Sequence, residues 1–281
     1  MINVIKTIYF IFIAWFLCRL KRNPLKSEGM ISIGNLLSRN EIITVLDLLN
    51  CGLLDSGTKI LFESLKSNNT LKHLYLSANG ITSVGLQYIH DYFETGKSEL
   101  NSLFLGCNRI GNEGSKIVSR FIKFPNKLTR LNLASSRIGA EGMKYLSESM
   151  IEHGKIQVLD IGYMRSTIDM GELGNYIEDT GAEYLSKLLE KSNLASLTIT
   201  NNHIKEYGLY KLVEALKKNK SLIYFDYTQF GISISSYVMD ELNKILTSNR
   251  EHFLTRNSDK KLNDIMVPDH VAEIYSVYRT H

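Results

Sequence analysis

"LKHLYLSANGITSVG", residues 71–85, carries the spacing that decides the fold. Leucines at 71, 74 and 76 precede an asparagine at 79, an isoleucine at 81 and a glycine at 85. The same offsets recur in "LNSLFLGCNRIGNEG", which starts at residue 100, and in "LTRLNLASSRIGAEG", which starts at residue 128. A fixed period of this length indicates a repeat protein, in which every unit is one small supersecondary element.

The repeat extends in both directions from this stretch. A step of 28 residues back finds "ITVLDLLNCGLLDSG" at 43–57, and one more finds "WFLCRLKRNPLKSEG" at 15–29. Further along, "LASLTITNNHIKEYG" fits at 194–208. Past Leu222 the pattern decays, with Phe230 at the Asn position, Ser236 at the Gly position and Asp240 at a helix-core position. Such decay is expected of a last unit that caps the array.

Each unit combines two periodicities. The L-x-L triplet has period 2 and predicts a short strand. After Gly85 the apolar residues Ile89 and Phe93 follow at four and eight residues, which is typical of a helix. The sequence therefore predicts an α/β protein in which one strand and one helix alternate, with the recurring glycines in turns. A single unit can bury its apolar edge only against its neighbours.

One residue in the turn after each strand, the third after the L-x-L triplet in "LYLSAN", is predicted to be structural. It stands where the chain turns inward, and its side chain can pair with loop backbone that a three-residue strand leaves unsatisfied. We call these positions the ladder: Asn23, Cys51, Asn79, Asn108, Ser136, Asn175 and Asn202.

These units resemble the leucine-rich repeat in its long, ribonuclease-inhibitor-like form. Similar units occur in Ran GTPase-activating proteins, innate-immune receptors and bacterial effector proteins. The resemblance covers roughly residues 15–250. It implies a horseshoe-shaped solenoid of about eight repeats, with a concave parallel sheet and convex helices, that serves as a recognition scaffold.

The two ends of the chain lie outside the regular repeats, and the N-terminal segment allows two interpretations. Residues 1–14 are mostly apolar, and the favoured interpretation is a cap on the open end of the solenoid. The alternative is a membrane anchor through residues 2–18, although a spanning helix needs about 20 apolar residues. Residues 251–281 leave the repeat and are predicted to form a C-terminal cap or tail with a short helix over 271–278.

One unit contains an insertion near 163–173. Its strand begins on pattern at Ile156, but the turn motif arrives late, at Asn175, Ile177 and Gly181. Long loops without secondary structure in compact folds are often functional. We place this segment at the rim of the concave sheet, where it can border a binding site.

Composition and motifs argue against catalysis and against nucleic acid. The net charge is +4, and no basic stripe runs along the repeats. There is no P-loop, no G-x-S-x-G and no zinc-like Cys/His spacing, so we expect no enzyme activity, cofactor or metal ion. Three cysteines are too few for a disulfide framework and favour a reducing, cytoplasmic location. Cys107 is expected on the exposed concave side.

The concave face is the predicted binding site. Side chains that flank the central leucine of each strand cannot join the core, and two of them, Tyr75 and Phe104, are aromatic neighbours. Interface hot spots favour aromatic centres with polar rims. The predicted partner-binding residues are Tyr75, Phe104, Asn132, Asp160, His73, Arg130, Tyr163 and Arg165.

The predicted function is a monomeric, non-catalytic scaffold that binds a protein partner on its concave face. One candidate setting is a secreted bacterial effector that acts in the cytosol of a host cell. Two alternatives stay open. The first is a regulator of a small GTPase, by similarity to the Ran activators; the second is a membrane-anchored recognition protein.

Overall fold

The computed structural model describes residues 17–165, 167–169, 171–231 and 234–256. In this part of the chain eight strands alternate with eight helices. The strands are β1 (Leu17–Arg19), β2 (Val45–Asp47), β3 (His73–Tyr75), β4 (Ser102–Phe104), β5 (Arg130–Asn132), β6 (Val158–Asp160), β7 (Ser196–Thr198) and β8 (Tyr224–Asp226). The helices are α2 (Lys26–Leu37), α3 (Leu54–Leu65), α4 (Ser83–Glu94), α5 (Gly111–Phe121), α6 (Ala140–His153), α7 (Glu178–Lys191), α8 (Glu206–Leu216) and α9 (Ser236–Arg256).

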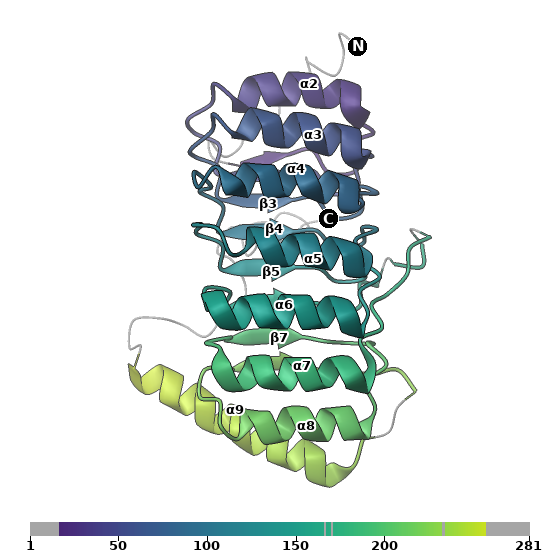
Figure 1. Cartoon of the computed structure of the whole chain (residues 1–281), viewed down its shortest axis with the longest axis vertical. Helices are drawn as coiled ribbons and strands as arrows, with labels where there is room; N and C mark the ends of the chain where they lie inside the picture. Colours follow the sequence, from purple (N-terminus) through teal and green to yellow (C-terminus); the bar gives the residue numbers. More distant parts are fainter. Residues whose placement is uncertain (1–16, 166, 170, 232–233, 257–281) are drawn as a thin grey trace, which may run out of the picture.

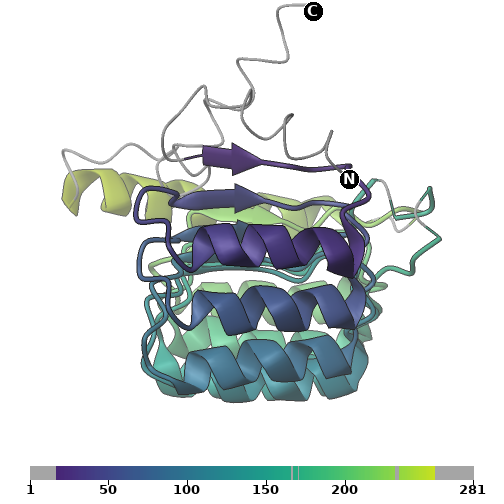
Figure 2. The same cartoon turned by 90° about the horizontal axis from the view of Figure 1, so that it is seen from above.

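The strands form one parallel sheet in the order of the sequence, β1 to β8. Register follows the repeat, so that Leu74 pairs with Leu103 and Tyr75 with Phe104. Helices α2 to α8 stack side by side along the solenoid, whereas α9 runs obliquely across its last end (Figure 1). Viewed from the end of the molecule, the stacked helices lie on one side of the sheet (Figure 2). The predicted α/β solenoid is confirmed. We number the units 1 to 8 by their strands and call the sheet surface away from the helices the sheet face.

The core lies between the sheet and the helices. In unit 3, Leu74 reaches it from β3, Leu76 from the residue directly after that strand, and Ile89 and Phe93 from α4; all four are fully buried. The ring of Phe93 stacks on Phe121 of the next unit, with centroids 4.8 Å apart. Neighbouring units therefore share one continuous apolar core, as a solenoid requires.

The ladder joins the turns of neighbouring units. Asn79 Nδ2 donates to Leu48 O of the preceding unit at 2.8 Å, while its Oδ1 accepts from Cys51 N at 2.9 Å. The first described unit bonds within itself, from Asn23 Nδ2 to Leu20 O. Each of the other ladder side chains donates to the preceding unit, at the backbone carbonyl of the residue directly after its strand. These pairs are Cys51 to Leu20, Asn108 to Leu76, Ser136 to Leu105, Asn175 to Leu133 and Asn202 to Ile161.

The ladder position of the last unit differs from the one that the repeat predicts. Phe230 was expected at the Asn position, but Gln229 makes the ladder bonds instead: its Nε2 donates to Ile199 O, and its Oε1 accepts from the N–H of Asn202. The longer glutamine side chain covers the shift of one residue. Phe230 turns outward and is 76% exposed.

The recurring glycines are not turn residues. Gly85 lies in the first turn of α4. A Cβ there would stand 2.5 Å from Asp55 Oδ1 of the preceding unit. That oxygen accepts from the N–H groups of Thr82 and Gly85 at 2.8 and 2.9 Å, and so caps the helix across the unit boundary. Glycine is needed here for close approach of two units.

The two ends lie partly outside the described residues. The predicted N-terminal cap or anchor (residues 1–14 and 2–18) and the predicted helix over 271–278 fall outside the described ranges. At the C-terminal end, α9 continues past residue 250 to Arg256 and buries Val238, Leu242 and Leu246 against the last unit. Within the described residues no helix combines the length and apolarity needed to cross a bilayer.

Replacing a ladder asparagine should destabilise the solenoid. We expect Asn79→Ala to lower the free energy of unfolding by roughly 1–3 kcal/mol, because buried backbone groups of two units lose their partner. Urea unfolding of the purified protein measures this. The matched control is Asn193→Ala at an exposed position, which should stay within about 0.5 kcal/mol of wild type. Equal stability of the two variants would contradict the role of the ladder.

Candidate protein-binding surface

An aromatic pair stands at the middle of the sheet face. Tyr75 ends β3 and Phe104 ends β4, and the parallel register sets the two residues side by side. Their rings are stacked, with centroids 4.1 Å apart and planes inclined by 4°. Both side chains are half-buried. Stacking of this kind fixes both rings and lowers the entropy that a contacting molecule would have to remove.

Polar side chains lie on both sides of the aromatic pair. Asn132 Nδ2, on β5, donates to Asp160 Oδ2, on β6, at 2.6 Å. His73 Nδ1 is 2.9 Å from Ser102 Oγ. This His–Ser contact has the spacing of a nucleophile and its base, but Ser102 is 0% exposed, so a substrate could not reach its hydroxyl. Arg130, on β5, is half-buried.

Three strands of the sheet face end in an aspartate: β2 in Asp47, β6 in Asp160 and β8 in Asp226. Burial raises the pKa of Asp160 to about 6, the N–H of Gly162 opposes the shift, and the nearby charge of Asp226 adds to it. Burial also raises the pKa of Asp47, against the N–H of Leu49 and the charges of Lys21 and Arg19. The sheet face therefore has an aromatic centre on β3 and β4, with aspartates on strands to both sides of it.

Two expectations about exposure are wrong. Val45 and Asp47 flank the central leucine of β2, yet both are buried rather than open on the sheet face. Cys107 was expected on the exposed concave side but is only 1% exposed. Its Sγ lies 3.6 Å from Met164 Sδ of the insertion, so this loop covers it.

The insertion lies along the turn edge, by which we mean the row of turns that follows the strands. It projects from the side of the solenoid (Figure 1). The Met164 N–H donates to Ser135 Oγ at 2.8 Å, and Thr167 Oγ1 donates to the same oxygen at 2.6 Å. The loop thus folds back over units 4 and 5. Arg165 is exposed, and Tyr163 lies at the turn edge, separate from the aromatic pair.

Glu172 anchors the far end of the insertion. Its carboxylate is 7% exposed and bonds Arg109 Nε of unit 4 at 2.9 Å and Arg137 Nη2 of unit 5 at 2.6 Å. Charge-assisted bonds to guanidinium groups are among the stronger hydrogen bonds in proteins. Nothing in the repeat pattern marks these three residues, because the insertion has no period.

A second apolar surface lies at the turn edge between the insertion and the last units. A hollow of about 390 Å³ is lined by Tyr163, Leu173, Tyr176 and Phe230, among others. The Phe230 ring meets Tyr163 at 6.4 Å in an edge arrangement. Three of these four side chains are exposed: Leu173, Tyr176 and Phe230. The sequence analysis did not identify these three as binding residues. The one sequence feature that could have indicated them is an aromatic residue, Phe230, at the Asn position of the repeat.

Loss of the Glu172 anchor should loosen the insertion. We expect Glu172→Gln to remove the countercharge of two arginines, to cost roughly 1–3 kcal/mol and to speed tryptic cleavage after the exposed Arg165. Mass spectrometry of the fragments over time measures the cleavage. Glu183→Gln, an exposed glutamate on α7, is the control. If both variants are cut at the wild-type rate, the carboxylate does not hold the loop.

Asp160 should make stability depend on pH. Because its folded pKa is raised from the usual value near 4 to about 6, the folded state binds more protons than the unfolded state between these values. The contribution of Asp160 to stability is therefore complete below about pH 4 and is lost as the pH rises through 6. Urea unfolding from pH 4 to pH 7 should show a flatter profile for Asp160→Asn. Parallel profiles would show that Asp160 is not perturbed.

Comparisons with known proteins agree with this architecture. A family model described as "Leucine Rich repeat" matches residues 67–89 and 125–147. The chain is 29% identical over 204 residues to mouse "NACHT, LRR and PYD domains-containing protein 5", covering 72% of this chain and 17% of that protein. It is 28% identical over 200 residues to mouse "NACHT, LRR and PYD domains-containing protein 14", covering 70% and 19%. The chain thus spans less than a fifth of the length of these relatives.

A solved structure shows the same fold. The chain superposes on the structure titled "Leiomodin-1 Actin-Binding Site 2 (ABS2)" with a TM-score of 0.51 and 16% identity, covering 60% of this chain and 91% of that one. At this identity the likeness concerns the fold alone. The ladder and cross-unit caps are consistent with the ribonuclease-inhibitor-like type. With its regular units, its open parallel sheet and these similarities, the chain is built of leucine-rich repeats in a solenoid of the α/β class.

Proposed function

We propose that this chain is a non-catalytic scaffold that binds a protein partner on its sheet face. The observation that carries the proposal is the stacked pair of Tyr75 and Phe104. Two aromatic rings in contact on a rigid sheet, with polar neighbours such as Asn132 and Asp160, have the composition of an interface hot spot. Parallel strands hold the pair in place, so binding would cost little ordering entropy.

The turn edge supports a larger footprint for the same partner. Leu173, Tyr176 and Phe230 expose apolar surface around the hollow. Exposed apolar patches with polar surroundings are typical of protein-interaction sites. The insertion connects this edge to the sheet face, because Asp160 ends β6 and Tyr163 begins the loop three residues later. We therefore propose the sheet face as the main contact and the turn edge as its border.

The oligomeric state, the cellular location and the alternative functions of this scaffold are proposed from the sequence. We propose a monomer in the cytoplasm, or in the cytosol of a host cell if the chain is a secreted bacterial effector. A small-GTPase regulator would accelerate GTP hydrolysis by a purified GTPase, and a membrane-anchored protein would float with lipid vesicles. A scaffold without these roles would do neither, so these two assays separate the alternatives.

The aromatic pair should be required for partner binding. Proteins captured from a cell lysate by the immobilised chain are identified first, and the affinity of a purified partner is then measured by calorimetry. We expect Tyr75→Ala with Phe104→Ala to weaken binding by about 30-fold or more, since hot-spot aromatics contribute about 2 kcal/mol or more. Loss of the stack should cost stability by only about 0.5–1.5 kcal/mol beyond lost burial.

The control removes two aromatic side chains from the helical side. Tyr207 and Tyr210 are exposed on α8, and the Tyr207→Ala, Tyr210→Ala variant should bind like wild type. If this control loses affinity while the sheet-face variant keeps it, the interface lies on the helices and the proposal is wrong.

A further inference from the structure

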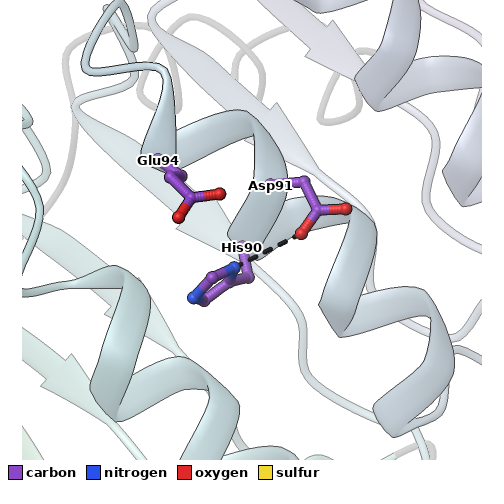
Figure 3. Close-up of side chains that lie close together, drawn as sticks. All are labelled: His90, Asp91 and Glu94. Atoms are coloured by element: carbon purple, nitrogen blue, oxygen red, sulfur yellow. Dashed lines mark hydrogen bonds and ion pairs between the residues drawn. The ribbon is translucent and has the colours of Figure 1, made fainter.

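Three side chains of metal-ligating type lie together on the helical side of the solenoid. His90, Asp91 and Glu94 project from α4, and Figure 3 shows their polar ends gathered beside the helix. Their potential ligand atoms all lie within 4.8 Å of one another. The cluster is on the opposite side of the molecule from the sheet face, so it is independent of the proposed partner site.

The helix itself places these groups. Residues 87, 90, 91 and 94 have the spacing i, i+3, i+4 and i+7, which puts them on one stripe of a helix. The opposite stripe of α4, with Ile89 and Phe93, is buried in the core and fixes the rotation of the helix. The polar stripe is thus held in place by packing and not by its own contacts.

The separation of two ligand atoms fits a tetrahedral metal ion. His90 Nδ1 and Asp91 Oδ1 are 3.4 Å apart. Two ligands at about 2.0–2.1 Å from a tetrahedral zinc ion are separated by about 3.4 Å. Both atoms also lie close to the amide nitrogen of Gln87, at 3.2 Å from His90 Nδ1 and 2.8 Å from Asp91 Oδ1. One electropositive group therefore already stands between the two ligand atoms.

Charge and packing favour a cation at the same point. Within the described part of the chain, neither Asp91 nor Glu94 forms an ion pair with a lysine or an arginine. The His90 side chain is 13% exposed, and its ring packs edge-on against Phe124 at 5.2 Å. The imidazole is thus held in one orientation beside two carboxylates that pair with no lysine or arginine among the described residues, which lowers the cost of organising a site.

We propose that His90, Asp91 and Glu94 bind one divalent transition-metal ion, with Zn²⁺ as the expected occupant. An imidazole with two carboxylates suits Zn²⁺, whereas Mg²⁺ and Ca²⁺ prefer oxygen ligands alone. Three protein ligands leave a fourth position for water. The amide of Gln87 turns away from the ion or presents its oxygen to it, since an N–H group cannot ligate a cation.

Titration with Zn²⁺ and Co²⁺ tests this site in the full-length protein. Calorimetry gives affinity and stoichiometry, and the visible absorption of bound Co²⁺ reports tetrahedral coordination. We expect one equivalent to bind, His90→Ala to abolish that binding event, and Glu94→Gln to weaken it at least tenfold. Glu94 is exposed, so its substitution leaves the fold intact even if His90→Ala, which loses the Phe124 contact, folds poorly.

The matched control is His153→Ala on α6. His153 Nε2 lies 3.8 Å from Glu152 Oε1, so it is also a histidine beside a carboxylate, but no group of three potential ligands forms there among the described residues. This variant should bind metal like wild type. Absence of binding by the wild-type protein would overturn the proposal. So would metal binding that Glu94→Gln leaves unchanged, or that His153→Ala abolishes.

Discussion

The backbone of the turns is the constraint on which this structure depends. Strands of three residues satisfy few backbone groups, and every turn leaves carbonyls that face the interior. The ladder resolves this by having one side chain per unit donate to the unit before, as Asn79 does to Leu48. Since the turn carbonyls of one unit, such as that of Leu48, are paired by the side chain of the next unit, stacking satisfies backbone groups as well as burying apolar surface. Stacking in register then lines the flanking strand residues into the columns of the sheet face.

The fold could be predicted from the sequence because its determinants recur at fixed offsets. The residues that pair across the sheet, such as Tyr75 and Phe104, could be predicted for the same reason, but the parallel stacking of their rings could not. Two of the wrong predictions fall where the period is broken. Gln229 replaces the expected Phe230 because a longer side chain compensates for a shift of one residue. Cys107 is buried by a loop whose path no repeat specifies.

The same break leaves a flaw in the ladder between units 6 and 7. Asn202 Oδ1 is buried and has no hydrogen-bond partner within the described residues, whereas the equivalent oxygen of Asn175 accepts from Ser136 and Ile138. A buried acceptor without a partner costs free energy. Asn201 and His203, the neighbours of Asn202, line the hollow together with Tyr163 and Phe230, so this unsatisfied side-chain oxygen lies close to an exposed apolar surface.

The anchored insertion also changes how the array should open. In a simple solenoid each unit contacts only its neighbours, and local opening can spread one unit at a time. Glu172 of unit 6 reaches past unit 5 to Arg109 of unit 4, and Met164 reaches Cys107 in the same way. Opening any of these three units breaks a contact with the other two. Units 4 to 6 therefore form one cooperative block, whose amide hydrogens would exchange with solvent together and later than those of either end.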